Sequence, residues 1–251
     1  FEVSPDGRWL AWALDDTGSE DYVLRIRNLE TGTDLPGTIP GVADSACWLP
    51  DGCSLLYTVR DAAWRPWRVL RHRHRPAAEL TALDDAILYE EPDGRFWVSV
   101  DLTQDRAWAV VHVASSETGE VHGCPAGEPS AGLRCLWPRR PGVEVTLDHQ
   151  QDRWLAVTNR DQVEFSLLAA PDGDDEPVWT PLWEPAPGET LEDCLPLAGH
   201  TVCQIRNRGQ VELRIRARGE PAWRPFRAGP DPHALELGEN PMFHTDRGRL
   251  A

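Results

Sequence analysis

The stretch SPDGRWLAW, from Ser4 to Trp12, decides the fold of this chain. Pro5-Asp6-Gly7 predicts a tight turn, because proline presets its own φ and glycine tolerates a positive φ. The apolar run after the turn predicts a strand from Trp9 to Leu14, and a short strand is expected to end at Val3. The stretch is therefore interpreted as a hairpin of two antiparallel strands.

Echoes of this hairpin recur along the chain. LPDGCSL at Leu49–Leu55 follows after 45 residues, and EPDGRFW at Glu91–Trp97 follows 42 residues later. Degenerate copies (HQQDRWL, LAGHTV and HTDRGRL) begin at His149, Leu197 and His244. A period near 45 residues, with a turn between short apolar runs, is typical of four-stranded propeller blades.

The repeats predict an all-β chain that forms a β-propeller of four-stranded antiparallel blades. About five blades and the start of a sixth fit into the 251 residues, and the alternating run Tyr22 to Asn28 is the expected third strand of the first blade. The 59 residues from Asp93 to Asp152 predict an insertion near the segment CPAGEPSAG. A β-sandwich is the alternative architecture, and the recurrence disfavours it.

Composition limits the possible partners. The net charge is −16 and all 25 basic residues are Arg, so the surface repels phosphate backbones and a nucleic-acid partner is not expected. No apolar run approaches the 18 residues of a spanning helix, so no membrane association is expected. The six Cys form no CxxC pair; we expect reduced, buried thiols, and disulfides stay open.

No motif for a metal or a cofactor stands out, and none is predicted. His72 and His74 alternate at a spacing that suits a metal on a strand, but the four Arg around them would repel a cation, so a solvated strand is expected. The pair Asp148-His149 lacks an activated serine nearby in the sequence and is expected to have a structural role.

An ordered series of phrases carries more information than the turns. It includes RPWRV from Arg65, YEEPD from Tyr89, WVSV from Trp97, SSETGEV from Ser115 and WPRRPGVE from Trp137. Together these phrases resemble the propeller of oligopeptidase B, in the prolyl oligopeptidase family of serine peptidases. The resemblance is strongest from Ser4 to Phe165 and weakens after Pro171.

The resemblance implies a seven-bladed propeller that covers an α/β-hydrolase domain with a Ser-Asp-His triad and admits only short peptides, cleaved after Arg or Lys. This chain departs from that pattern, because no Ser is bracketed by Gly in a G-x-S-x-G nucleophile elbow. Residues 1–251 are therefore expected to be part of the propeller of a longer enzyme, without its hydrolase domain. The chain alone is expected to be inactive, so no catalytic residue is assigned.

The partners that the resemblance implies are short basic peptides and the hydrolase domain of the same polypeptide. It also implies a cytoplasmic protein, although a segment before Phe1 would leave periplasmic export open. A propeller that lacks blades exposes sheet edges, so the isolated chain is expected to aggregate or fold marginally. The alternative function is a stand-alone, non-catalytic propeller that binds a protein or a small ligand.

The loops between the second and third strands of the blades, here called B–C loops, are the candidate functional surface. They are expected at residues 15–21, 60–65, 115–119, 159–162 and 206–209, and in the resembled family they face the catalytic domain. The residues predicted for substrate gating or for the domain interface are Asp15, Asp16, Glu20, Asp21, Arg60, Arg65, Ser115, Ser116, Glu117 and Arg160. The acidic ones are expected to attract cationic peptides or to pair with Arg of the hydrolase domain, and a merely solvated loop is the alternative.

Overall fold

The structure is a computed structural model that describes residues 1–75, 78–173, 177–226, 236–238, 240–245 and 247–249. It divides into two compact units, each described here by itself. Unit 1 contains Phe1–Leu102 and Trp108–Arg139, and unit 2 contains Thr103–Ala107 and the described part of Arg140–Ala251. Apart from a short 3-10 turn, η1 (Pro129–Ala131), every element in the described residues is a β-strand, which confirms the predicted all-β class. No helix among them is long and apolar enough to span a membrane.

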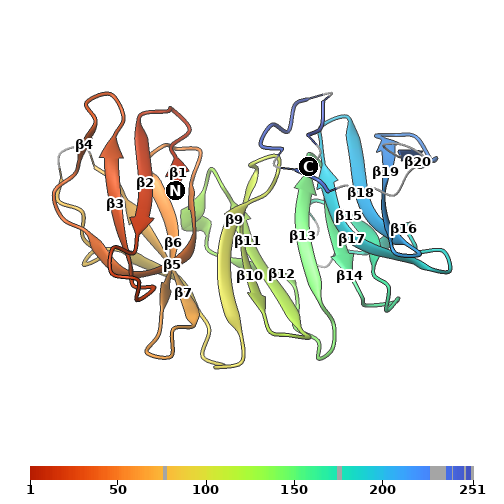
Figure 1. Cartoon of the computed structure of the whole chain (residues 1–251), viewed down its shortest axis with the longest axis horizontal. Helices are drawn as coiled ribbons and strands as arrows, with labels where there is room; N and C mark the ends of the chain where they lie inside the picture. Colours follow the sequence, from red (N-terminus) through yellow and green to blue (C-terminus); the bar gives the residue numbers. More distant parts are fainter. Residues whose placement is uncertain (76–77, 174–176, 227–235, 239, 246, 250–251) are drawn as a thin grey trace. The chain divides into compact units, whose positions relative to one another are not determined.

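Unit 1 holds three blades whose strands follow one another side by side (Figure 1). Blade 1 contains β1 (Glu2–Val3), β2 (Trp9–Leu14), β3 (Tyr22–Asn28) and β4 (Thr33–Asp34). Blade 2 contains β5 (Ile39–Trp48), β6 (Ser54–Arg60), β7 (Pro66–Arg73) and β8 (Ala86–Glu90). Blade 3 contains β9 (Trp97–Leu102), β10 (Trp108–Ala114), β11 (Gly119–Pro125) and β12 (Arg134–Trp137). The strands predicted at Trp9–Leu14 and Tyr22–Asn28 are confirmed.

Unit 2 holds two further blades, so five four-stranded groups are described in all. Blade 4 contains β13 (Val145–Gln150), β14 (Arg153–Thr158), β15 (Ser166–Pro171) and β16 (Thr180–Trp183). Blade 5 contains β17 (Glu189–Pro196), β18 (His200–Asn207), β19 (Gln210–Ala217) and β20 (Arg224–Phe226). In the expected start of a sixth blade, Asp246 and Leu250 lie outside the described residues, and the described residues after Phe226 form no strand.

The long strand β5 belongs to two blades at once. Its first half pairs with β3, where Ile39 lies opposite Leu24, and its second half pairs with β6, where Trp48 lies opposite Leu55. A register shift after Val42 separates the halves. Blades 1 and 2 therefore form one eight-stranded sheet, and β5 takes over most of the outer edge that β4 only begins.

Within each unit, single side chains tie neighbouring blades together across apolar cores. The indole of Trp48, 1% exposed, donates from Nε1 to the carbonyl oxygen of Glu2 at 3.1 Å. In unit 2 the buried Gln150 donates from Nε2 to the carbonyl oxygens of Leu197 (2.6 Å) and His200 (2.9 Å). A buried polar group is costly unless it is hydrogen-bonded, so these contacts select one arrangement of each pair of blades.

The turns between the first and second strands of blades 1 and 2 are held by an aspartate. In the first, Asp6 accepts hydrogen bonds from the Ser4 hydroxyl (2.6 Å) and the Arg8 amide (3.1 Å), while Gly7 adopts a φ of 72°. The second copy places Gly52 at a φ of 66°. Its aspartate, Asp51, accepts from the Ser54 hydroxyl at 2.7 Å. Both Pro-Asp-Gly turns therefore have the predicted role.

The third Pro-Asp-Gly, at residues 92–94, has a different role, which corrects the prediction. It joins β8 of blade 2 to β9 of blade 3, and the backbone of Gly94 is outside the left-handed region. The equivalent turn of blade 3 is Thr103–Ala107, where Asp105 accepts from the Thr103 hydroxyl at 2.8 Å and Arg106 adopts a φ of 59°. A non-glycine residue thus occupies the position that glycine fills in the first two turns.

This corrected register also moves the predicted insertion. The turn aspartates now lie 54 residues apart from Asp51 to Asp105, and 47 apart from Asp105 to Asp152. The extra residues therefore lie in the interval that contains the long connection between β7 and β8. The unit that contains CPAGEPSAG has the same spacing, 47 residues, as the next interval from Asp152 to Gly199.

The glycines of the second and third motifs give a matched test of this assignment. We expect Gly52→Ala to lower the free energy of unfolding by about 1 kcal/mol, because alanine is strained at a positive φ. Gly94→Ala should change it little, since no heavy atom lies within 4 Å of the added methyl group at either position and only the backbone angle differs. Urea unfolding of the two variants measures the difference, and equal losses would contradict the corrected register.

Candidate functional site

All five B–C loops lie between the second and third strands of their blades. Four residues predicted as loop ends, Arg60, Gly119, Arg206 and Asn207, lie within strands. Three belong to unit 1 and two to unit 2, so the first three are considered as one surface. That the loops of all five blades share one face stays a prediction.

The first B–C loop is shaped by Asp15. Its Oδ1 accepts from the amides of Thr17 (2.9 Å) and Gly18 (2.9 Å), and its Oδ2 accepts from the amide of Glu20 at 2.6 Å. Although desolvation opposes the shift, these hydrogen bonds lower the pKa of Asp15 to about 2. They also hold Glu20 in the left-handed conformation, with a φ of 62°. Asp15 therefore organises the loop and stays charged in doing so.

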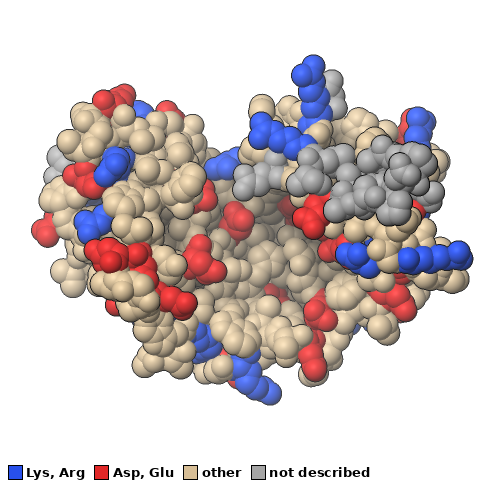
Figure 2. Space-filling model, viewed as in Figure 1, with Lys and Arg blue, Asp and Glu red and all other residues tan. Residues whose placement is uncertain are grey.

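The remaining acidic side chains of this loop, Asp16, Glu20 and Asp21, face solvent. Figure 2 shows acidic side chains, in red, gathered at the loop end of β2 and β3. This acidic rim, as we call these three residues, is the densest negative group among the described B–C loops of unit 1.

Arg60 connects the acidic rim to the second B–C loop. Its guanidinium donates to the carbonyl oxygen of Glu20 and, at 3.0 Å, to the carboxylate of Asp21. The same group lies 4.2 Å from the ring centroid of Trp64, whose side chain is half exposed. The Arg60 side chain is 11% exposed and that of Asp21 is 61% exposed, so only the arginine side of this ion pair is shielded from water. The structure thus brings two of the predicted loops together.

Arg65 has a different environment from Arg60, because it is buried. Its Nε donates to Asp61 at 2.9 Å, and its Nη1 donates to the carbonyl oxygens of Asp93 (2.8 Å) and Phe96 (2.9 Å). Its Nη2 donates to the carbonyl oxygen of Glu91 at 3.2 Å. The guanidinium therefore clamps the connection between β8 and β9, which explains why a buried cation is tolerated there.

The other predicted residues are separate from the acidic rim. Ser115, Ser116 and Glu117 lie in the short loop between β10 and β11, where the Ser115 amide donates to the carbonyl oxygen of Thr118 at 2.9 Å. Arg160 lies in unit 2 and pairs with its neighbour Asp161 at 2.8 Å.

Sequence reasoning missed a polar network beside the connection that Arg65 clamps. The buried carboxylate of Glu91 accepts from Arg139 at 2.5 Å, and Arg139 also donates to Glu120 at 2.7 Å. Glu120 in turn contacts His122. These residues come from three separate segments, 19 to 48 positions apart, so no local pattern could have paired them.

This network also contains the one mixed group of metal-ligating atoms found among the described residues. Atoms of Glu120, His122 and Cys135 lie within 4.8 Å of one another. The guanidinium of Arg139 already neutralises Glu120, which disfavours a cation. We therefore assign this group a structural role.

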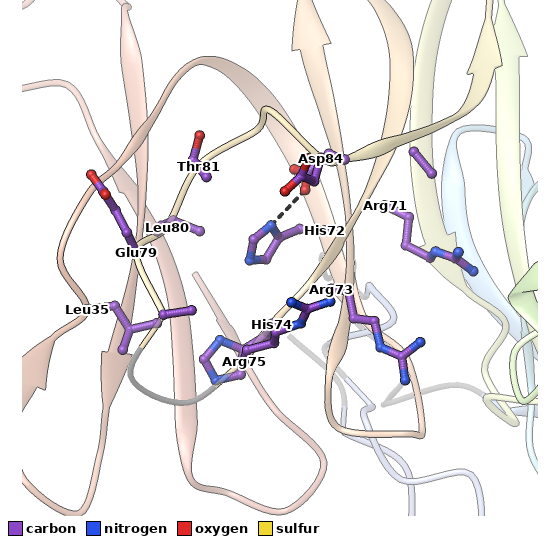
Figure 3. A pocket seen from close by; sticks show the side chains of 13 residues that line it. Leu35, Arg71, His72, Arg73, His74, Arg75, Glu79, Leu80, Thr81 and Asp84 are labelled. Carbon is purple, nitrogen blue, oxygen red and sulfur yellow. Dashed lines mark hydrogen bonds and ion pairs between the residues drawn. The ribbon is translucent and has the colours of Figure 1, made fainter.

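A pocket of about 260 Å³ lies beside β7 in unit 1 (Figure 3). His72 Nδ1 lies 2.8 Å from a carboxylate oxygen of Asp85, while His74 packs edge-on against the ring of Trp9. Both histidines are buried, so the expected solvated strand is wrong at these positions. Burial lowers the pKa of His74 to about 4, which keeps it neutral.

The pair Asp148-His149 belongs to a buried cluster in unit 2. His149 Nδ1 lies 2.7 Å from the carboxylate of Asp105, and Asp148 accepts from the amide of Gln104 at 2.8 Å. Burial raises the pKa of Asp148 to about 7; its hydrogen bonds oppose the shift, and the Asp105 carboxylate adds to it. Both residues hold the Thr103–Ala107 turn, in agreement with the structural role predicted for them.

Comparison with known proteins identifies this architecture. Residues 1–236 match the family described as the N-terminal β-propeller domain of prolyl oligopeptidase. The chain therefore belongs to the propeller domain of prolyl oligopeptidase-family serine peptidases, as the resemblance indicated.

Individual relatives agree with this assignment. The chain is 31% identical over 250 residues to dipeptidyl aminopeptidase BI of Pseudoxanthomonas mexicana, covering 98% of this chain and 34% of that protein. It is 29% identical over 174 residues to protease 2 of Moraxella lacunata, covering 68% of this chain and 25% of that protein. The structure of oligopeptidase B from Leishmania major superposes with a TM-score of 0.89 at 22% identity, covering 99% of this chain and 36% of that one. The matches thus span between a quarter and just over a third of the length of these relatives.

The clamp at Arg65 gives a stability prediction. We expect Arg65→Ala to lower the free energy of unfolding by about 3 kcal/mol, because it leaves buried carbonyl oxygens and the Asp61 carboxylate without their hydrogen-bond donor. Arg95→Ala removes an arginine from the same connection, but its side chain is 81% exposed and should cost little. Chemical denaturation of both variants checks this, and a small effect at Arg65 would show that the clamp is dispensable.

Asp148 gives a pH-dependent prediction. Because its pKa is about 7 in the folded chain and near 3.8 in the unfolded one, stability is lost as pH rises between these values. We expect Asp148→Asn, which keeps the Oδ1 acceptor, to raise the free energy of unfolding at pH 8 by on the order of 2 kcal/mol, with no gain near pH 3.

The matched control for this prediction is Asp152→Asn. Asp152 lies close by in the sequence, is exposed, and pairs with Arg218, which lowers its pKa. This variant should gain nothing at pH 8. Equal behaviour of the two variants across this pH range would contradict the buried ionisation of Asp148.

Proposed function

We propose that this chain is the propeller part of a serine oligopeptidase, where it covers a hydrolase domain of the same polypeptide and guides short, positively charged peptides to it. The observation that carries the proposal is the acidic rim of blade 1, which Arg60 ties to the second B–C loop. Family membership supports the peptidase class, and the rim suggests the charge of the substrate.

The physical basis is electrostatic. Asp16, Glu20 and Asp21 place three carboxylates on one loop of a chain whose net charge is −16, and Arg60 offsets the charge of Asp21. Clustered negative charges on one surface raise the local concentration of cationic ligands and their association rate, and salt screens this attraction. Because Asp15 holds the loop through its own hydrogen bonds, the three carboxylates are displayed on an ordered backbone.

Two substrate specificities are consistent with such a rim. Cleavage after Arg or Lys supplies a cationic side chain, and it is the specificity that the resemblance to oligopeptidase B suggests. Release of dipeptides supplies a free α-ammonium group, and the name of the Pseudoxanthomonas relative favours it. Acetylation of a peptide's N-terminus distinguishes them, because it removes the second charge and leaves the first.

We further propose that exposed B–C loop residues such as Ser116 and Glu117 contribute to docking on the hydrolase domain, and that the protein is cytoplasmic. The buried Arg65 supports these loops through its backbone contacts and does not itself face a partner.

Reading the gene on both sides of residues 1–251 tests directly whether the chain belongs to a serine oligopeptidase. A G-x-S-x-G elbow followed by Asp and His is expected; if the gene lacks such a domain, the stand-alone binding propeller becomes the better proposal.

Charge reversal in the complete enzyme tests the rim. We expect the double substitution Asp16→Lys and Glu20→Lys to lower kcat/KM for an Arg-ended peptide about tenfold at low salt, because electrostatic steering is lost. The deficit should shrink as ionic strength rises. Glu30→Lys, at the opposite end of β3, is the matched control for the single substitution Asp16→Lys, because both change the total charge by the same amount. An unchanged kcat/KM in the double variant would show that the rim does not steer substrate.

A further inference from the structure

Two of the six cysteines lie directly opposite each other in blade 5. Cys194 on β17 and Cys203 on β18 are register partners in an antiparallel pair of strands, so their side chains lie on the same face of the sheet. The other cysteines on paired strands face different residues: Cys47 lies opposite Leu56, Cys124 opposite Ala109, and Cys135 opposite His122.

The hydrogen-bond pattern shows which kind of pair this is. At the end of the hairpin, Leu197 and His200 exchange both backbone hydrogen bonds, at 2.8 and 3.3 Å. Hydrogen-bonded and non-hydrogen-bonded pairs alternate along an antiparallel ladder, so Cys194 and Cys203, three steps away, form a non-hydrogen-bonded pair. In agreement, the Cys194 amide donates to its neighbour Asp193 at 2.7 Å.

This distinction matters because non-hydrogen-bonded partners are the closer kind. Their Cα atoms are typically about 4.5 Å apart, within the range of about 4.4–6.8 Å that disulfides span. Both thiols are reduced in the structure, and the neighbouring Cys203 thiol together with burial raises the pKa of Cys194. Formation of a bond between them therefore requires little movement of the backbone.

We propose that Cys194 and Cys203 form a redox site that closes to a cross-strand disulfide with an oxidant of the disulfide class, such as glutathione disulfide. Cys194 is partly exposed and Cys203 is 0% exposed, so the oxidant reaches Cys194 first. The Cys194 thiolate attacks one glutathione sulfur, the glutathione S–S bond breaks, and one glutathione thiolate leaves.

In the second step the Cys203 thiolate attacks Sγ of Cys194 and releases the other glutathione. The two protein thiols together lose two electrons, which reduce glutathione disulfide to two glutathione molecules. The protons of the two cysteines end on these products, so the exchange is balanced. The resulting disulfide links β17 covalently to β18, close to the turn whose Leu197 carbonyl accepts a hydrogen bond from Gln150.

The experiment places the intact polypeptide that carries this chain in glutathione redox buffers, both folded and in urea. Residues 161–206 form a single tryptic peptide that contains Cys194 and Cys203 and no other cysteine. Acid quenching, alkylation and mass spectrometry of this peptide report the disulfide as the loss of two hydrogens and of both alkylation sites.

We expect the folded protein to form half of the disulfide at a ratio of oxidised to reduced glutathione at least about tenfold lower than in urea, because the fold holds the thiols together. The Cys135→Ser control, which removes an exposed thiol without a cysteine opposite it, should leave this ratio unchanged. Cys203→Ser should stop at the mixed disulfide on Cys194. If the folded and unfolded chains require the same ratio, or if the folded wild type also stops at the mixed disulfide, the proposal is wrong.

Discussion

The hydrogen bond that the hydroxyl of a Ser or Thr donates to a nearby aspartate is the interaction on which this fold depends. It closes the first turn of blades 1, 2 and 3 and brings the two inner strands of each blade into register. Since a shift of one residue moves every side chain of a strand to the opposite face, these short contacts decide which residues enter the core. The later blades replace the hydroxyl partner with longer-range contacts, above all those of Gln150.

Charged side chains in this chain fall into two groups that composition cannot separate. Arg65, Glu91 and Asp148 are buried or partly buried and work on the backbone or on one another. Asp16 and Glu20 face solvent and are free to act on a ligand at a distance. A net charge of −16 is therefore a poor guide to the electric field at any one surface. The positions of the exposed charges, once the structural charges are set aside, show where that field is strong.

Much of the fold could be predicted from the sequence because the signals for its turns and strands are local. Pro5-Asp6-Gly7 and the alternation from Tyr22 to Asn28 fix strands within a few residues, and the B–C loops follow from them. The third blade was misplaced because Arg106 takes a conformation that glycine usually marks, while Gly94 does not need it.

The candidate site was only half accessible to sequence reasoning. The exposure of Asp16 follows from its polar loop, but the burial of Arg65 depends on carbonyl groups about 30 residues away. The pair Glu91 and Arg139 joins the segments that follow β8 of blade 2 and β12 of blade 3, and nothing in either local sequence indicates the other partner. Long-range polar pairs of this kind can be found only in the three-dimensional structure, because their spacing along the chain follows no regular period.

The continuous strand β5 limits how this domain can be rearranged in evolution. Most propeller repeats end at a loop between blades, so whole blades can be duplicated or lost as modules. Here the junction between blades 1 and 2 lies inside a paired strand, and a cut there would leave β3 without Ile39 and its neighbours. These two blades must therefore be inherited as a single block, and a viable circular permutation would have to open the chain at another junction.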